Sequence, residues 1–162
     1  MKRIIILAAL LLTTICSFAQ SGKSIYEKYS DNEGVSAVYI SPAMFRLIGK
    51  LPEVKADVEG GSVDLAPVIS TLTGMYLLNT SNEQIKNSLY EDVKRFVSSR
   101  KYELLMEAKD SGEAMRIYTI GTEKTVNGFV MISKDSEETA FICIEGKMDR
   151  SQLEALLSQS MK

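Results

Sequence analysis

Five side chains in this sequence have types and spacings that could support acid–base chemistry. Asp31, Asn32 and Glu33 form a polar cluster in the segment YSDNEGVSAVYISP, and Glu103 and Glu107 lie four residues apart in YELLMEAKD. Paired carboxylates act as acid and base in glycosidases. Asp31 with Glu33, or Glu103 with Glu107, are therefore the candidate pairs for a carboxylate-dependent hydrolase or isomerase.

Other catalytic and ligand-binding arrangements are missing from the sequence. It contains no histidine, which removes Ser–His and Cys–His nucleophile pairs, His-ligated zinc and the commonest general base. Gly60 and Gly61 lack the context of a dinucleotide or phosphate loop. Counted from Asp57, an EF-hand loop would require glycine at Ser62 and glutamate at Val68. We therefore expect neither a cofactor nor a metal site.

The Asp31–Glu33 cluster also has a purely structural interpretation. Ser24 and Glu27 have the spacing of a capping box, which predicts a helix over residues 24–30. Gly34 can adopt the left-handed conformation that ends such a helix, and Asp and Asn side chains bond their own backbone in turns. The cluster is then the turn that follows the helix.

The next segments alternate between short elements. Residues 35–40 are apolar on both faces except at Ser36, which predicts an interior strand. Ser41 and Pro42 have the order of an N-cap and a first helical residue, so a helix is expected through about Leu51.

A polar loop is expected over residues 52–62. Asp64 is interpreted as the N-cap of a helix that runs through Thr73 and ends at Gly74, and residues 75–79 are expected to form a short strand.

The clearest helix lies between about Ser81 and Ser99, where Ser81 and Gln84 suggest a second capping box. Apolar residues recur at helical spacing on one side: Ile85, Leu89, Val93 and Phe96. The other side carries charged residues and is expected to face solvent: Lys86, Glu91, Lys94 and Arg95.

From Tyr102 onward the period changes to that of strands. Four strand-like runs, YELLMEAKD, EAMRIYTIG, TVNGFVMISKD and ETAFICIEG, are separated by short turn signals and predict an antiparallel four-stranded meander. In the first run, alternation places one set of residues towards the core and the other towards water: Tyr102, Leu104, Met106 and Ala108 against Glu103, Leu105, Glu107 and Lys109.

Asp149 and Gln152 then suggest the start of a final helix with an apolar side formed by leucines: Leu153, Leu156 and Leu157. The predicted fold class is α+β: a mostly antiparallel sheet with a C-terminal four-stranded meander and helices packed on one face. Residues 20–162 are expected to form a single domain.

The first 20 residues, MKRIIILAALLLTTICSFAQ, have the features of a secretory signal peptide. Lys2 and Arg3 precede an apolar run over residues 4–15, and small residues precede a cleavage site after Ala19. The run is shorter than the roughly 20 residues that span a bilayer. We therefore expect an exported protein, periplasmic or extracellular, with a signal peptide over residues 1–19 and no membrane span.

Two cysteines bear on this expectation. Cys16 could be acylated in a lipoprotein, but Ile15 stands where a small residue is needed, which argues against it. Cys143 would be the single cysteine after cleavage and lies among apolar residues, so a buried thiol without a disulfide is expected. Cleavage would leave 17 basic against 21 acidic residues, a net charge of −4, and no basic cluster for nucleic acid.

Three segments carry a family resemblance: IYEKYSDNEGVSAVYIS, YELLMEAKDSGEAMRIY and ICIEGKMD. Across residues 24–157 the chain resembles domain-of-unknown-function family 4252, small exported proteins of Bacteroidetes. The resemblance implies a small envelope protein linked to envelope signalling or stress, and it assigns no catalytic residue.

The sequence thus predicts a non-enzymatic module that binds an envelope protein or a small ligand, with the second face of the meander available for contact. The alternatives are a histidine-free carboxylate enzyme and an assembly protein that adds a strand to a sheet edge. The oligomeric state is left open.

Overall fold

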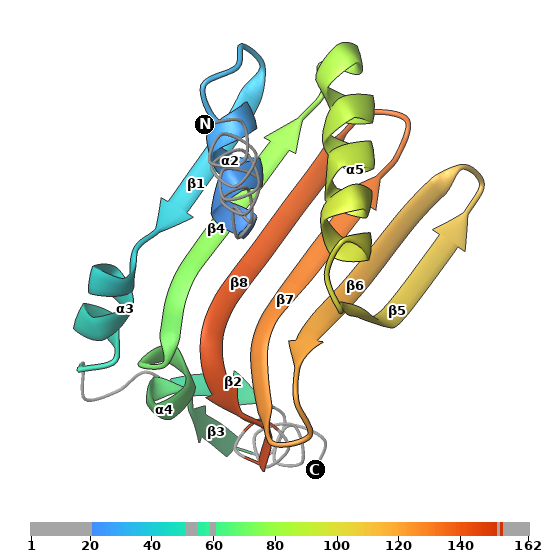
Figure 1. The fold of residues 1–162 in the computed structure, drawn as a ribbon. Helices are drawn as coiled ribbons and strands as arrows, with labels where there is room; N and C mark the ends of the chain where they lie inside the picture. Colours follow the sequence, from blue (N-terminus) through green and yellow to red (C-terminus); the bar gives the residue numbers. More distant parts are fainter. Residues whose placement is uncertain (1–20, 51–54, 59–60, 152, 154–162) are drawn as a thin grey trace, which may run out of the picture.

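The computed structural model describes residues 21–50, 55–58, 61–151 and 153. Its centre is a six-stranded sheet in the order β1-β4-β8-β7-β6-β5, in which every neighbouring pair is antiparallel (Figure 1). The strands are β1 (Val35–Ile40), β4 (Leu72–Thr80), β5 (Glu103–Asp110), β6 (Glu113–Gly121), β7 (Thr125–Lys134) and β8 (Thr139–Asp149). The predicted α+β class and the C-terminal meander β5–β8 are confirmed.

Two helices, α2 (Gly22–Tyr29) and α5 (Glu83–Ser98), pack on the same face of this sheet (Figure 1). The core lies between them and the three central strands. It is formed by Ile25 and Tyr29 of α2, by Leu89, Val93, Phe96 and Val97 of α5, and by Tyr76, Leu78, Val130, Ile132, Phe141 and Cys143 of the sheet. The burial expected for Cys143 is confirmed, and burial raises the pKa of its thiol.

Three smaller elements connect β1 to β4. They are α3 (Pro42–Ile48), the hairpin β2 (Lys55–Val58) with β3 (Gly61–Asp64), and α4 (Ala66–Ile69). Ser41 caps α3 by accepting a hydrogen bond from the Met44 N–H at 3.3 Å, as predicted. The helix ends at Ile48, and Leu51 lies outside the described residues.

Several sequence predictions in this region were wrong. The expected polar loop over residues 52–62 contains the β2–β3 hairpin. The expected helix from Asp64 to Thr73 is limited to α4, and Gly74 lies inside β4, because residues from Leu72 onward pair with β8. Asp64 still accepts a hydrogen bond from the Ala66 N–H at 2.9 Å.

The strand at residues 35–40 exists, but the expectation that it is interior was wrong. Among the described residues, β1 pairs only with β4 and forms one edge of the sheet (Figure 1). Its apolar side chains are therefore not enclosed between two strands, and Val38 and Tyr39 are 50% and 45% exposed.

The first two proposed capping boxes are displaced in the structure. Helix α2 begins at Gly22, so Ser24 lies inside it and donates from its hydroxyl to the Ser21 carbonyl at 2.8 Å. Helix α5 is capped by Asn82, whose Oδ1 accepts from the Gln84 and Ile85 N–H groups at 3.0 and 3.3 Å. The predicted apolar side of α5 does face the core.

The last predicted helix is only partly described. Asp149 Oδ1 accepts from the Ser151 N–H at 2.9 Å, as an N-cap would. Gln152, Leu156 and Leu157 lie outside the described residues, as does the predicted signal peptide.

Candidate binding surface

The face of the sheet opposite α2 and α5, which we call the open face, is defined by the strand register. Cys143 and Phe141 point into the core beneath the helices, so their neighbours Ile142 and Ile144 point the other way. Directly paired residues share a face in an antiparallel sheet. The printed pairs therefore extend the open face from β8 to every other strand.

Three rows of residues cross all six strands on the open face. The middle row is apolar throughout: Val38, Leu77, Ile142, Met131, Ile117 and Met106. One flanking row is small or uncharged: Ser36, Asn79, Ala140, Ser133, Met115 and Ala108. The other is mainly apolar: Ile40, Met75, Ile144, Phe129, Thr119 and Glu103.

Charge is nearly excluded from these rows. Glu103 is the one charged member, and it sits at a corner on the edge strand β5. Asp110 and Glu113 lie on the same side beyond the rows, at the tip of the β5–β6 hairpin. The open face is thus an apolar centre with acidic residues at its margin.

The open face remains partly accessible. The four central members of the middle row are all partly exposed, whereas core residues on the helix-covered face are almost fully buried. With strands about 4.8 Å apart and alternate residues about 6.7 Å apart, the three rows cover on the order of 600 Å². Five of the eighteen residues are polar, so the apolar part is about 400 Å², within the 300–600 Å² of the largest apolar patch on an ordinary monomer, and such patches often mark an interaction site.

On the helix-covered face, polar side chains form clusters, one that links α2 to α5 and another that links α5 to the β7–β8 turn. Asp92 on α5 is nearly buried and accepts a hydrogen bond from the Tyr29 hydroxyl at 2.7 Å. Lys28 and Arg95 also donate to its carboxylate. Burial raises the pKa of Asp92, but the hydrogen bonds from Lys28, Tyr29 and Arg95 outweigh it and hold that pKa below its ordinary value. Burial, with the bond to Asp92, raises the pKa of Tyr29.

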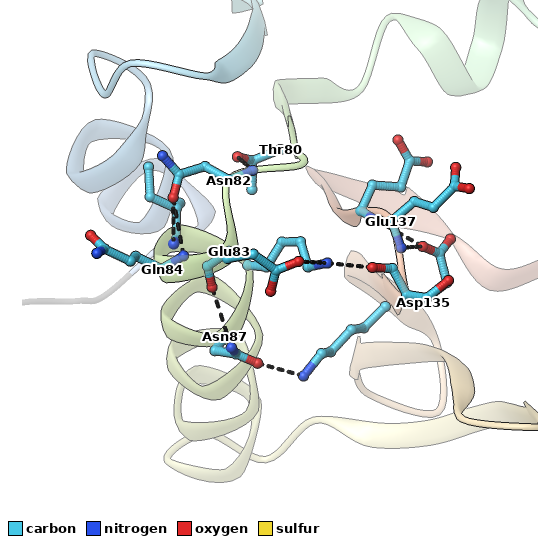
Figure 2. Close-up of polar contacts among 12 residues, drawn as sticks. Thr80, Asn82, Glu83, Gln84, Asn87, Asp135 and Glu137 are labelled. Carbon is cyan, nitrogen blue, oxygen red and sulfur yellow. Dashed lines mark hydrogen bonds and ion pairs between the residues drawn. The ribbon is translucent and has the colours of Figure 1, made fainter.

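A second polar cluster fastens the start of α5 to the β7–β8 turn (Figure 2). Lys86 is buried and donates to Glu83 at 2.8 Å and to the Ser136 carbonyl at 2.6 Å, so the expectation that it faces solvent was wrong. Asn87 accepts from Lys134 at 2.6 Å. These residues bind the chain to itself, so the open face, with its apolar middle row, is the better candidate for binding a partner.

A cleft of about 600 Å³ lies between α2 and α5, lined by Ser24, Ile25, Lys28, Asp92, Arg95, Phe96 and Ser99. Its charged groups are the ones that already bond each other through Asp92. This arrangement gives a small ligand few uncommitted polar groups.

The first group of carboxylates singled out by the sequence occupies a turn. Asp31, Asn32 and Glu33 connect α2 to β1, as predicted, and all three are exposed. The Asn32 N–H donates to the Tyr29 carbonyl at 3.1 Å, and Gly34 takes the left-handed conformation with φ of 79°.

The second group is split across the sheet. The register shifts between Leu104 and Met106, so Glu103 pairs with Thr119 and Glu107 pairs with Arg116. This bulge places Glu103 on the open face and Glu107 on the opposite face, whereas strict alternation placed both on one side. Every residue of β5 is exposed, so of the expected core-facing side only Tyr102, just before β5, packs against the core, and the expectation was wrong for Leu104, Met106 and Ala108.

Glu107 is engaged in ion pairs, with its carboxylate 2.9 Å from Lys109 and 2.5 Å from Arg116. Hydrogen bonds from Lys109 and Arg116 lower its pKa. The β1 end with Asp31 and Glu33 lies at the opposite edge of the sheet from Glu103 and Glu107. The structure therefore does not join the two carboxylate groups into one site.

The open face was not identified as a site from individual residues, although the sequence holds a signal for it. Segments TVNGFVMISK of β7 and TAFICI of β8 are apolar at consecutive positions. This pattern means that both faces of the strands are apolar. Because both helices pack on one face of the sheet, the apolar residues of the other face stay partly exposed, and the sequence does not show this placement.

Among the described residues, no helix is both long and apolar enough to cross a membrane. The same residues contain no cluster of three potential metal-ligating side chains.

Comparison with known proteins gives a family without an assigned activity. Neither a curated protein nor a solved structure matches the chain. A family model for a domain of unknown function, DUF4252, matches residues 27–156, which include all six strands of the main sheet and the end of α2. The chain is a member of the DUF4252 family.

Proposed function

We propose that this chain is an exported, non-enzymatic binding module that holds another protein of the cell envelope on its open face. The observation that carries the proposal is the middle row, which is apolar on all six strands. The signal-peptide features of the first 20 residues support a location outside the cytoplasm. The family resemblance to envelope proteins connected with signalling or stress supports that context.

A protein partner suits this surface better than a small molecule. Small-ligand sites are concave and contain a few convergent polar groups. The three rows form a sheet surface in which Glu103 is the single charged residue, at a corner. A surface on the order of 600 Å² approaches the roughly 800 Å² that each partner buries in a standard interface. We therefore expect an apolar, shape-complementary surface on the partner.

The proposal is tested by affinity capture from the chain's own host, with a tag on the C-terminus and three forms of the protein. These are the unaltered sequence, Met131→Lys at the centre of the middle row, and Leu104→Lys as a matched control. Leu104 is 52% exposed and lies on the helix-covered face. Lysine at Met131 places a charge where the partner must exclude water.

A protein retained by the unaltered chain and by Leu104→Lys, but lost from Met131→Lys at equal thermal stability, is the expected result. Retention of the same proteins by all three forms, or of none by any, would contradict the proposal.

A further inference from the structure

The two edges of the sheet differ in how they are protected against pairing with another strand. Natural edge strands carry charges, proline or bulges that prevent such pairing. Edge strand β5 has these features, with charged residues along its length and a register shift between Leu104 and Met106. Edge strand β1, VSAVYI, has no charged residue and no proline, and its register with β4 runs unbroken from Val35 to Ile40. Only β1 is unprotected.

Exposed apolar side chains continue from β1 onto the helix that follows it. Val38 and Tyr39 of β1 are 50% and 45% exposed, and Met44 and Leu47 of α3 are 49% and 63% exposed. Figure 1 shows β1 and α3 along the same side of the molecule, with no strand drawn beyond them. This side, which we call the β1–α3 edge, thus combines apolar side chains with a strand whose outer edge has no neighbouring strand among the described residues.

We propose that the β1–α3 edge is a pairing site for a second copy of this chain, with the two β1 strands antiparallel about a two-fold axis normal to the sheet. Identical surfaces meet in such an interface, so a charge on one would face the same charge on the other. β1 carries none, although the chain as a whole contains 40 charged residues and is net negative. The absence of charge along β1 therefore allows the two strands to pair, and the one charged residue of the β1–α3 edge, Arg46, lies on α3.

The symmetry keeps both pairs of helices on one side of a continuous sheet. The open faces then adjoin, and with the axis at Val38 the middle row passes from Val38 of one copy into Val38 of the next. This inference concerns the sheet edge and does not rest on binding at the open face. The dimer would double the width of the apolar surface available to a partner.

The alternation of side chains limits the possible registers. Residues directly opposite each other must point to the same face, so the axis lies midway between the two copies of one residue, which is then paired with itself. An axis at Val38 pairs residues 36–40 and places Tyr39 opposite Ala37 of the other copy. An axis at Ala37 pairs residues 35–39 and places Tyr39 opposite Val35. Both bring aromatic or β-branched side chains into cross-strand contact.

The interface is small by the standards of permanent dimers. A strand edge about 20 Å long and two layers about 20 Å thick presents on the order of 400 Å² per copy. The two copies together would bury about 800 Å², which is below the roughly 1,200–2,000 Å² of stable specific interfaces and fits a weak, transient one. We therefore expect a reversible dimer whose population rises with protein concentration.

Sedimentation velocity over a range of concentrations provides the first test. Val38→Lys adds the charge that natural edges use, and Leu105→Lys makes the same kind of change at the protected edge, where Leu105 is 56% exposed. The unaltered chain and Leu105→Lys should dimerise equally, and Val38→Lys should raise the dissociation constant about tenfold or more, which corresponds to about 1.4 kcal/mol. Monomers at all concentrations would overturn the proposal. So would a dimer that survives Val38→Lys and is lost in Met131→Lys, since that result would place the second copy on the open face.

Single cysteines give a second, independent test in a Cys16→Ser background, where the remaining Cys143 is fully buried. Opposed residues in an antiparallel pair have Cα atoms about 4.5–5.5 Å apart, within the range that a disulfide spans. Mild oxidation should therefore cross-link either Val38→Cys or Ala37→Cys, depending on the axis, and should leave Leu105→Cys as monomer. No preference for positions 37 and 38 over position 105 would overturn the proposal. Partner capture by the open face is scored separately, so failure of one test does not imply failure of the other.

Discussion

The contact between α2 and α5 depends on Asp92, and its removal should weaken the fold measurably. In the unaltered chain the Tyr29 hydroxyl donates a hydrogen bond to the Asp92 carboxylate at 2.7 Å. In Asp92→Ala this buried hydroxyl loses its acceptor. A hydrogen bond to a charged group contributes about 1.5–3 kcal/mol, and an unsatisfied buried group costs about 1–3 kcal/mol. Lys28 and Arg95 are 58% and 75% exposed, so their screened ion pairs add less than about 1 kcal/mol each. We expect a loss of about 2–4 kcal/mol.

Equilibrium unfolding in urea at pH 7 measures this loss, with Arg95→Ala as the control. The control removes one exposed partner and leaves the Tyr29 bond intact, so it should cost about 0.5 kcal/mol. If Asp92→Ala and Arg95→Ala differ by less than the error of the two measurements, the reasoning that the buried hydroxyl dominates is refuted.

The same contact predicts a dependence on pH. The pKa of Asp92 is lowered in the folded protein from its ordinary value of 3.8. The folded state therefore favours the carboxylate, and its stabilising contribution is complete well above pH 3.8 and is lost as the pH falls through the lowered pKa. The stability difference between the unaltered chain and Asp92→Asn should be constant near neutral pH and shrink in acid. A difference that grows in acid would contradict this assignment.

Three further substitutions test the packing and caps. Gly22→Ala would place a Cβ 2.3 Å from the Cys143 sulfur, so a loss of about 1–3 kcal/mol is expected in urea unfolding, partly restored by Cys143→Ala. Asn82→Ala removes the cap of α5 and should lower the unfolding free energy by about 1 kcal/mol, with faster amide exchange in the first turn. Lys86→Ala removes a side chain that is 4% exposed and should cost about 2 kcal/mol, whereas Lys94→Ala, 42% exposed, should cost less than about 0.5 kcal/mol by the same assay.

The meander and α5 could be predicted because their signals are local. Alternation and short turns determine β5–β8, and the recurrence of Ile85, Leu89, Val93 and Phe96 determines which side of α5 is buried. These patterns depend on neighbours within a few residues of each other. Because these patterns depend only on nearby residues, the predictions made from them agree with the structure.

The errors arose where a distant part of the chain decides the outcome. The start of α2 is set by Glu145, which accepts the Gly22 N–H at 2.7 Å from across 123 residues of sequence. The helical pattern predicts that Lys86 is on the surface, because it gives no sign that the Ser136 carbonyl, 50 residues away in sequence, accepts a hydrogen bond from it. The sequence of β1 reads as interior because apolar residues on both faces indicate burial, but nothing local reveals that β1 has one neighbour.

The candidate site shows the same limit. Glu103 and Glu107 were expected on one face, and a single bulge at Leu105 separates them. The open face is a property of six strands brought together from residues 35–149. Each strand contributes one residue to the middle row, so no single segment of the sequence displays it.

The most direct test of binding at the open face is photo-crosslinking in the chain's own host. A photoreactive amino acid replaces Met131 in the middle row or, as a control, Lys94 on α5, which is 42% exposed. The account predicts a discrete adduct with another envelope protein from position 131 and none from position 94. No adduct from position 131, or the same adducts from both positions, would contradict it.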